Sequence, residues 1–380
     1  MNLRFLLARI GLSSLFCCAF ASSQQPDDDG FVSLFTGKNL SGWHNVNGAS
    51  DTWSVRDEKI ICSGKPICLL RTVKQYQNFV LELDWLHLQP KGNSGCFVWS
   101  DAITARGQPF SKAIECQILD GQETENYTSH GDVFAIHGAV MTPDRPHPAG
   151  WMRCLPSERR SKPAGQWNHY RISCVDGTVK LEVNGKEVAG GSEVNPRKGY
   201  ICLESEGSEV HFRRLRIKEL PPAKEPLKPE QVAATDVGFE RLYSGVDLSG
   251  WRVAALDAAH WKVKDWKLEC DGLGGPILSE REVGDGVVVV DWRWNSKPSS
   301  SAFPFDLRGA LVASKLEAHV KEGEWSRCEI ALRQDKATIV LNGKTLAENV
   351  PLPGLPAQGS IVLGGKATGP VQFANIYVRP

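Results

Sequence analysis

The sequence predicts an all-β protein built from two tandem jelly-roll β-sandwiches. Three observations favour this fold. The 380 residues include 36 Gly and 22 Pro but only three Met, a composition typical of turn-rich β proteins. Apolar and polar residues alternate with a period of two, as expected for strands with one buried face. One sequence unit also occurs twice, and the length suggests more than one domain.

The charge balance limits the classes of partner. The chain has 44 basic and 44 acidic residues, so its formal net charge is zero. A neutral chain gives no electrostatic reason to expect binding to nucleic acid or to an anionic membrane surface. The apolar content of 41% fits a folded globular protein and argues against disorder.

Residues 1–23 are expected to be a secretory signal peptide. Arg4 supplies a positive start, and residues 5–20 are mostly apolar. Ala19 and Ala21 place small residues at the −3 and −1 positions of a cleavage site. A membrane anchor is the alternative, but the uncharged run is short for a bilayer span and contains several polar residues. We therefore expect an exported protein, periplasmic or extracellular, with no integral membrane segment after cleavage.

Nine cysteines remain after the signal peptide is removed. An odd count requires at least one free thiol or an intermolecular bond. No CxxC motif and no Cys/His cluster at zinc-ligand spacing is present in the sequence. Cysteines within apolar, strand-like runs are expected to be buried free thiols: Cys96, Cys116, Cys174 and Cys202. Cys62 and Cys68 are close enough in sequence to staple a hairpin.

The repeated unit predicts the domain organisation. Two early matches have an offset of 208 and a later one an offset of 158: 30–43 with 238–251, 52–64 with 260–272, and 165–172 with 323–330. The second copy therefore lacks most of the segment between residues 99 and 165. We expect domains at 24–220 and 237–380, joined by a stiff, solvated linker rich in Pro, Lys and Glu at 221–236.

Each copy carries the signals of antiparallel strands. Residues 79–85 and 288–294 alternate between apolar and other side chains. Asn-Gly pairs at 184–185 and 342–343 lie between alternating runs, and type I′ hairpin turns require the positive φ that these residues tolerate. No stretch has a sustained helical stripe. Each copy is therefore predicted to be an antiparallel β-sandwich of the jelly-roll type.

Candidate catalytic residues lie on one predicted strand, 111–120. Glu115 and Gln117 are two residues apart and share a face of a strand. Ile114, Cys116 and Ile118 would then face the core. A bulge after Ile118 would return Asp120 to the polar face. Such a row of acid, amide and acid suits sugar chemistry, although a strand face with merely solvated carboxylates is the alternative.

The segment between residues 120 and 165 has no regular periodicity and is absent from the second copy. A long irregular segment inside a compact domain is typically functional or disordered, and its apolar residues argue against disorder. Its polar and aromatic candidates are His130, Asp132, Trp151, Arg153 and Lys162. Trp151 would stack on a sugar face or clamp the loop. Asn93, within the Gly-Asn-Ser-Gly turn at 92–95, would reach a ligand or simply form the turn.

Six motifs of the N-terminal copy occur in a fixed order: 31–43, 92–95, 115–120, 130–132, 162–168 and 199–207. In this order they resemble the 3-keto-disaccharide hydrolase family, and the resemblance spans residues 30–220. It implies a concanavalin A-like jelly roll, with 3-keto-glycoside 1,2-lyase and 3-keto-2-hydroxy-glucal hydratase chemistry on a carbohydrate substrate. The second copy has residues 298–302 in place of the 92–95 turn, so we expect it to be a carbohydrate-binding or structural partner.

In the implied chemistry the C3 ketone acidifies the C2 proton, and a base removes this proton. Hydrogen-bond donors stabilise the resulting enediolate, and an acid protonates the leaving group at C1. We assign Glu115 as the base and Asp120 or His130 as the acid. The expected substrate-binding residues are Asn93, Gln117, Asp132, Trp151, Arg153 and Lys162. Asp132 with Glu115 or Asp120 would offer oxygen ligands to a divalent cation. No nicotinamide is expected, because no GxGxxG motif opens a helix.

Two alternatives stay open. A retaining glycosidase of the β-glucanase type uses a similar strand motif and needs two carboxyl groups about 5–5.5 Å apart. Gln117 stands where those enzymes typically have an acid, which weakens this interpretation. The other alternative is a non-catalytic pair of lectin-like modules, which would suit two sandwiches and twelve Trp.

Overall fold

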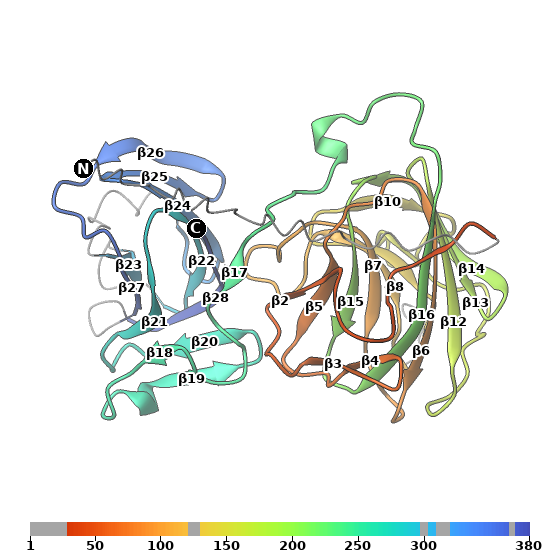
Figure 1. Ribbon diagram of the computed structural model, residues 1–380, viewed down its shortest axis with the longest axis horizontal. Helices are drawn as coiled ribbons and strands as arrows, with labels where there is room; N and C mark the ends of the chain where they lie inside the picture. Colours follow the sequence, from red (N-terminus) through yellow and green to blue (C-terminus); the bar gives the residue numbers. More distant parts are fainter. Residues whose placement is uncertain (1–28, 121–129, 297–302, 309–319, 365–368) are drawn as a thin grey trace, which may run out of the picture.

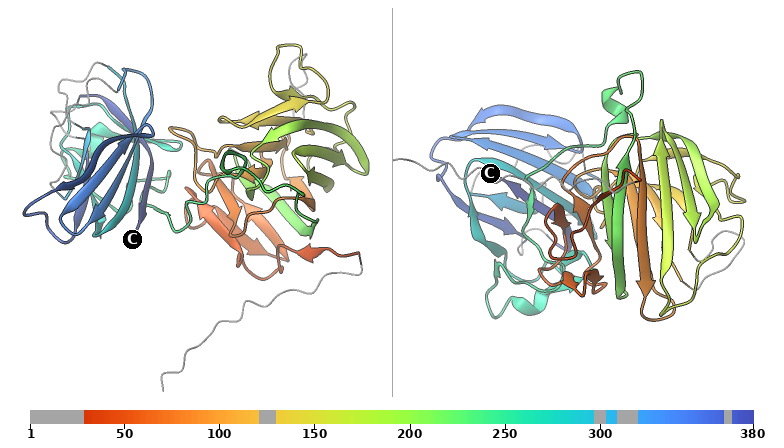
Figure 2. Two further views of the ribbon diagram at one scale, coloured as in Figure 1. Left: turned by 90° about the horizontal axis from the view of Figure 1, so that it is seen from above. Right: turned by 45° about the vertical axis from the view of Figure 1, so that its right-hand side comes forward.

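The computed structural model describes residues 29–120, 130–296, 303–308, 320–364 and 369–380. The predicted signal peptide at 1–23 and the segment 298–302 lie outside these ranges. Two jelly-roll β-sandwiches lie side by side (Figure 1), and a view from above also shows them as separate bodies (Figure 2). The predicted all-β fold is confirmed. No helix within the described ranges has the length and apolar character that a membrane span requires.

Two sheets, A and B, form the N-terminal sandwich. In spatial order, sheet A contains β10 (Val140–Pro143), β14 (Lys186–Asn195), β13 (Thr178–Val183), β12 (Asn168–Val175), β6 (Phe79–His87), β16 (Val210–Glu219), β4 (Lys59–Cys62) and β3 (Trp53–Arg56), with β1 (Val32–Ser33) also paired to β16. Sheet B contains β11 (Arg153–Cys154), β9 (Val133–Ile136), β8 (Ala113–Gln117), β7 (Gly95–Ser100), β15 (Tyr200–Ser205), β5 (Cys68–Thr72) and β2 (Trp43–Val46).

Sheets C and D form the C-terminal sandwich. Sheet C contains β19 (Trp261–Lys264), β20 (Lys267–Cys270), β28 (Val371–Arg379), β22 (Gly286–Trp294), β24 (Ser326–Arg333), β25 (Lys336–Leu341) and β26 (Lys344–Pro351), with β17 (Glu240–Arg241) also paired to β28. Sheet D contains β18 (Trp251–Arg252), β21 (Ile277–Val283), β27 (Gly359–Leu363) and β23 (Phe305–Leu307). Two short 3-10 helices, η1 (Pro229–Gln231) and η2 (Ala258–His260), lie between strands.

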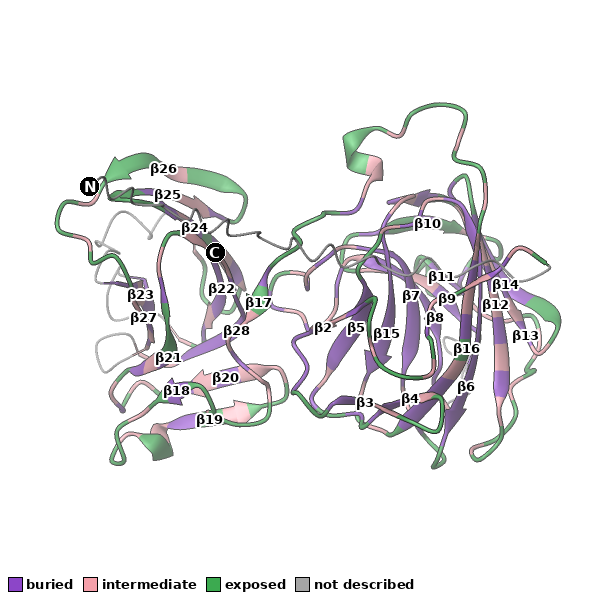
Figure 3. Cartoon of the chain, in the orientation of Figure 1, coloured by how far each residue is buried: buried purple, intermediate pink, exposed green. Residues whose placement is uncertain are grey.

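The hydrophobic core of the N-terminal sandwich lies between sheets A and B. Alternate residues of β6, including Leu83 and Trp85, pack inward with less than 2% exposure. The polar residues between them are buried as well, so all of β6 is buried (Figure 3). Glu82 accepts a 2.8 Å hydrogen bond from Arg216, and Asp84 accepts one of 2.9 Å from His169. Long side chains of neighbouring strands thus shield both carboxylates.

The two predicted hairpin turns are confirmed. Val183 pairs with Lys186 and Leu341 with Lys344, which leaves a two-residue Asn-Gly turn in each hairpin. All four turn residues have φ between 48° and 83°, as type I′ turns require. These turns fix the register of β13 with β14 and of β25 with β26.

The nine cysteines in the described residues are all free and buried. The predicted buried thiols at 96, 116, 174 and 202 are therefore confirmed. Cys62 and Cys68 do not staple the hairpin; they end β4 and begin β5, which belong to different sheets. Burial raises the pKa of the Cys62 thiol to about 11, so it is protonated and unreactive at neutral pH.

The end of the segment 221–236 is not solvated as expected. Ala233 is 3% exposed, and its N–H donates a 2.7 Å hydrogen bond to the carbonyl of Lys198. Ala234 N–H donates a 2.7 Å bond to the Asp101 carboxylate. The connection therefore lies against the N-terminal sandwich before the chain enters β17.

The loop between β7 and β8, residues 101–112, joins the two sandwiches. Its Ala102 and Phe110 pack on the outer face of sheet B. On its other side, Thr104 hydroxyl hydrogen-bonds Tyr377 hydroxyl at 2.8 Å, and the Arg327 guanidinium donates a 2.8 Å bond to the Thr104 carbonyl. Asn375 donates 3.0 Å bonds to the carbonyls of Ala105 and Gln108. Sheet C thus holds a loop that lies on the outer face of sheet B.

Candidate functional site

Glu115 lies near the middle of a row of side chains that crosses all of sheet B. Strand register places one residue of each described strand in this row: His44, Arg71, Cys202, Phe97, Glu115, Phe134 and Arg153. Directly opposed residues in antiparallel strands share a face. Ile114, Cys116 and Ile118 pack in the core between the sheets, as predicted. Glu115 therefore lies on the outer face of sheet B.

Two carboxyl groups meet in the site, those of Glu115 on β8 and Glu204 on β15. Gly95 on β7 lies between them. A Cβ on Gly95 would lie 2.8 Å from Glu115 Oε1 and 2.8 Å from Glu204 Oε2. The two oxygens are therefore no more than twice this distance apart. Both residues are nearly inaccessible, with exposures of 4% and 1%. A side chain at 95 would fill the space in which they meet.

A third carboxyl group, that of Glu206, completes an acidic cluster with these two. Burial and the charges of Glu115 and Glu206 raise the pKa of Glu204 well above its ordinary value. Burial also raises the pKa of Glu206. Glu204 is 1% exposed, and its Oε2 has no hydrogen-bond partner among the described residues. Asn93 Nδ2 donates to Glu206.

Arg153 sets the charge on the other side of Glu115. Its Nε donates a 2.6 Å hydrogen bond to Asp132 Oδ2, and its guanidinium lies 4.1 Å from the centre of the Phe134 ring. Burial and the charge of Glu206 raise the pKa of Glu115 well above its ordinary value, whereas Arg153 lowers it. Glu115 is therefore a more basic carboxylate than one in water.

His130 lies in a different cluster, between the sheets. Its ring centre is 4.8 Å from that of Trp85 and 6.1 Å from that of His87, and its Nδ1 is 2.5 Å from Ser161 Oγ. Burial, with the charges of His87 and Arg159, lowers the pKa of His130 to about 3. The ring is consequently neutral at physiological pH.

Asp120 is also separate from Glu115. The strand β8 ends at Gln117 instead of continuing through the expected bulge. Asp120 Oδ2 accepts a 3.1 Å bond from Lys91 N–H, and Arg159 lies 3.9 Å from Oδ1. Neither Asp120 nor His130 is among the groups that shift the pKa of Glu115. The structure thus brings Glu115 together with Glu204 and Glu206.

The remaining candidates fall into two groups. Gln117, Asp132, Arg153 and Asn93 belong to the acidic cluster or border it, but Gln117 Oε1 accepts a 2.9 Å bond from Ile118 N–H. Trp151 is 52% exposed and stacks on His147, with ring centres 4.7 Å apart. Lys162 is exposed, and its backbone N–H donates to Asn168.

The donor set does not fit the predicted cation. Asp132, its expected ligand, accepts hydrogen bonds from Arg153. Within the described ranges, no three His, Cys, Asp or Glu side chains are arranged to hold a metal ion. We therefore derive no metal-assisted step.

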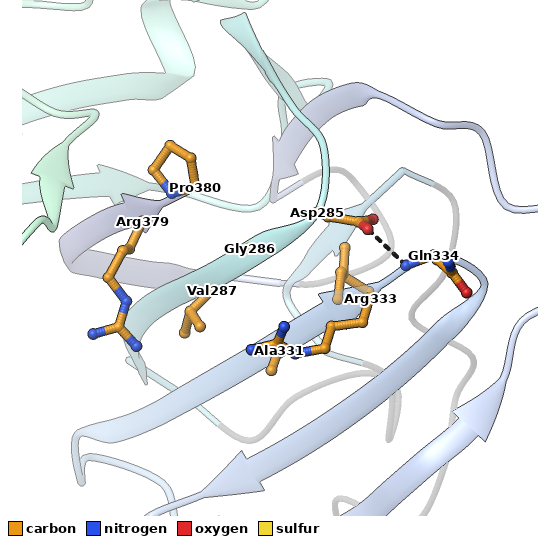
Figure 4. Close-up of a pocket in the computed structure, with 9 residues that line it drawn as sticks. Asp285, Gly286, Val287, Ala331, Arg333, Gln334, Arg379 and Pro380 are labelled. Atoms are coloured by element: carbon orange, nitrogen blue, oxygen red, sulfur yellow. Dashed lines mark hydrogen bonds between the residues drawn. The ribbon is translucent and has the colours of Figure 1, made fainter.

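Surface hollows occur away from the acidic cluster. One lies at the ends of β22, β24 and β28, where Asp285 accepts a 2.8 Å bond from Gln334 N–H and Arg379 lies on the opposite side (Figure 4). A second lies where β2 meets residues 240–249.

The sequence motif at 199–207 contains the two acids that the prediction omitted, Glu204 and Glu206. Their alternation along the chain is the period expected of side chains on one face of a strand. The pairing of β15 with β7 then places Glu204 beside Gly95, a juxtaposition that local sequence does not reveal.

Comparisons with known proteins show what the chain is similar to. The chain is 22% identical to a 3-keto-disaccharide hydrolase of Bacteroides thetaiotaomicron over 251 residues, which cover 54% of this chain and 84% of that protein. A crystal structure from Parabacteroides distasonis, of a protein thought to be a glycosyl hydrolase, is 24% identical. It covers 51% of this chain and 95% of its own, with a TM-score of 0.41. A Bacillus licheniformis β-glucanase is 14% identical over 50% of this chain and 97% of its own, with a TM-score of 0.32.

The sequence profile of one family, described as the 3-keto-alpha-glucoside-1,2-lyase-like domain, matches residues 30–218 and 303–379. These ranges cover most of the chain and include the strands that carry Glu115, Gly95 and Glu204. The chain belongs to the 3-keto-alpha-glucoside-1,2-lyase-like domain family.

Proposed function

We propose that this protein cleaves 3-keto-glycosides by elimination followed by hydration. The observation that carries the proposal is the meeting of the Glu115 and Glu204 carboxyl groups above Gly95, on the outer face of sheet B. The family and the B. thetaiotaomicron relative support the substrate class. The product of the two steps is a free 3-keto sugar and the released alcohol.

Proton transfers in both steps need one base and one acid. Glu115, whose burial strengthens it as a base, would take the C2 proton, and the electron pair would move into the enediolate of the C3 ketone. Protonated Glu204 would donate to the C1 oxygen as the C1–O bond breaks. Addition of water across the C1–C2 double bond then returns one proton to C2 and leaves a hydroxyl at C1. Glu204 replaces Asp120 and His130 in the role of the acid.

The test compares a 3-keto-disaccharide with its unoxidised parent. We expect turnover of the keto form only. Glu115→Gln and Glu204→Gln should each lower kcat at least 100-fold, in the range of lost general acid–base catalysis. Glu187→Gln is the matched control, because this exposed glutamate lies at the start of β14. Activity should also fall at low pH, where Glu115 becomes protonated, and at high pH, where Glu204 loses its proton.

The main alternative is a retaining glycosidase. The short distance between two carboxyl groups favours it, since such enzymes place their nucleophile and acid about 5–5.5 Å apart. Turnover of the unoxidised parent would establish this alternative, and binding of either sugar without turnover would establish a lectin-like protein.

We also propose that the protein is exported. The supporting observation is the order of features in residues 1–23: a positive charge comes first, an apolar run follows, and small residues come last. Mass spectrometry of protein recovered outside the cytoplasm should show a mature N-terminus close to residue 22. An intact N-terminus on cytoplasmic protein would contradict the proposal.

A further inference from the structure

The hollow between the two sandwiches contains an arginine that has no ion-pair partner within the described residues. It has a volume of about 370 Å³ and lies where β2 meets β17 and the residues that follow (Figure 1). His44 and Asn45 line it from the N-terminal sandwich; Glu240, Arg241, Tyr243 and Ser244 line it from the C-terminal sandwich.

Arg241 is the principal unneutralised charge. Its side chain is half-buried, and within the described residues no hydrogen bond or ion pair engages its guanidinium. Burial lowers its pKa, and the other groups that act on it are the Cys68 thiol and the Tyr377 phenol. A guanidinium has five N–H donors, so a partly desolvated one without an acceptor is costly.

Arg71 adds to this charge, and His44 lies beside it. They are directly opposed in the β2–β5 ladder and share the outer face of sheet B. Arg71 is 4% exposed, donates to the Thr72 carbonyl and lies 4.2 Å from the Tyr200 ring centre, but its Nε has no described partner. Burial, Arg71 and Arg241 lower the pKa of His44. Arg71, Arg241 and His44 therefore lie within electrostatic range of one another.

Glu240 is the carboxylate in the described lining of the hollow, and it is already engaged. Arg281 donates to Glu240 Oε2, and this pair is largely neutral. Glu240 raises the pKa of His44, but less than burial, Arg71 and Arg241 lower it. The groups that act on Arg71 and Arg241 are thiols and phenols, with no carboxylate among them.

We propose that this hollow binds a tetrahedral oxyanion, a sulfate or phosphate group, with Arg241 as the principal ligand, His44 as a second ligand that the anion would protonate, and Arg71 behind His44 as a supporting charge. A dianion matches two guanidinium charges, and guanidinium–oxyanion hydrogen bonds are among the stronger ones in proteins. The ion would be either free in solution or carried by a sugar. The site joins both sandwiches, so occupancy would also stabilise their contact.

Calorimetric titration of the full chain with inorganic sulfate, inorganic phosphate, glucose 6-sulfate and glucose tests the proposal. We expect saturable one-site binding of an oxyanion and none of glucose. Tighter binding of glucose 6-sulfate than of free sulfate would identify a sugar-borne group, and equal binding would identify the free ion. The histidine resonances should show a higher pKa for His44 when the oxyanion is bound, because the anion favours imidazolium.

Arg241→Gln should weaken oxyanion binding at least tenfold, while Arg252→Gln is the matched control. Arg252 is an exposed arginine on neighbouring β18 that already donates to Ser360. Without the ion, Arg241→Gln should raise the melting temperature, since it removes an unpaired, half-buried charge, and this rise also reports that the variant folds. Added phosphate should then raise the melting temperature of wild type but not that of the variant.

Three results would overturn the proposal. They are no saturable binding of any oxyanion, equal binding by Arg241→Gln and wild type, or binding that leaves His44 unchanged. None of these depends on turnover of a 3-keto-glycoside, so the site and the proposed function fail independently.

Discussion

Gly107 of the N-terminal sandwich donates its backbone N–H to Asp291 of the C-terminal sandwich, at 2.7 Å. Asp291 is fully buried and also accepts bonds of 2.7 and 2.9 Å from Arg327 and one of 2.8 Å from Asn375. One carboxylate therefore organises the residues that hold the β7–β8 loop. Because this loop also packs beside Phe97, the neighbour of Glu115, the C-terminal sandwich supports the outer face of sheet B.

Gly107→Ala should separate the two sandwiches. Gly107 has φ of +67°, and a Cβ there would lie 2.1 Å from the ring of Trp325. Overpacking of this kind costs about 1–3 kcal/mol, in addition to about 1–2 kcal/mol for an L-residue in the left-handed region. Differential scanning calorimetry should show one transition for wild type and two for the variant.

Gly185→Ala is the matched control for that experiment. Gly185 has φ of +83°, but nothing lies within 4 Å of its Cβ position. Gly185→Ala should therefore lose only the stability that an L-residue costs in the left-handed region, and it should keep a single transition. If both variants melt in one transition at the same temperature, the loop does not hold the sandwiches together.

Gly95→Ala should reduce activity more than stability. The added Cβ would force the carboxyl ends of Glu115 and Glu204 apart, and these flexible ends can move without displacing backbone. Displacement of reacting groups by about 1 Å can cost about 100-fold in rate. Turnover of a 3-keto-disaccharide should fall by this order, with the variant still folded by circular dichroism.

Gly284→Ala provides the control for this strand substitution. Its Cβ position has ordinary contacts, the nearest at 3.5 Å from the Ala357 carbonyl. Its activity should equal that of wild type. Full activity in Gly95→Ala would show that the two carboxyl groups do not act together.

The features predictable from the sequence are those that depend on near neighbours in the chain. The Asn-Gly turns and the inward face of Ile114 and Cys116 follow from backbone preference and the period of two. Glu115 is placed correctly on the outer face for the same reason. The position of Glu204 beside it depends instead on the pairing of β15 with β7, which joins residues far apart in sequence.

The errors have the same origin. The grouping of Asp120 with Glu115 needs a bulge, whereas Ile118 exchanges backbone hydrogen bonds with Ser94 and Asp120 N–H donates to the Gly92 carbonyl, which continues the β7–β8 register without a bulge. His130 also lies away from the face that carries Glu115, and its ring packs on Trp85 between the sheets. The role of the β7–β8 loop has no local signal at all, because its partners Asp291 and Asn375 belong to the other sandwich.

The nine described thiols should be unreactive in the native protein. All are buried, and burial raises the pKa of Cys62 to about 11 and of Cys202 to about 12. Thiolate is the reactive form, so native protein at pH 8 should react negligibly with a disulfide reagent. After unfolding in guanidinium, mature protein should show nine thiols. A smaller number would reveal disulfides.

Glu204 should make the protein less stable as pH rises. Its pKa in the folded state lies well above its ordinary value because of burial and its acidic neighbours. The folded state therefore binds more protons than the unfolded state between these two pKa values, and stability falls as pH rises through this interval. For one such group, the free energy of unfolding falls by at most about 1.4 kcal/mol per pH unit. Urea unfolding of wild type between pH 5 and pH 8 should show this loss.

Glu204→Gln isolates this contribution, since glutamine keeps the shape and cannot ionise. The variant should be more stable than wild type at pH 8 and depend less on pH, while it loses turnover. Glu187→Gln, an exposed change, should follow wild type at every pH. Equal pH slopes in Glu204→Gln and wild type would mean that Glu204 is ionised in the folded state, and it could not then serve as the acid. Higher stability with lost activity would show that the cluster is retained for chemistry at a cost to the fold.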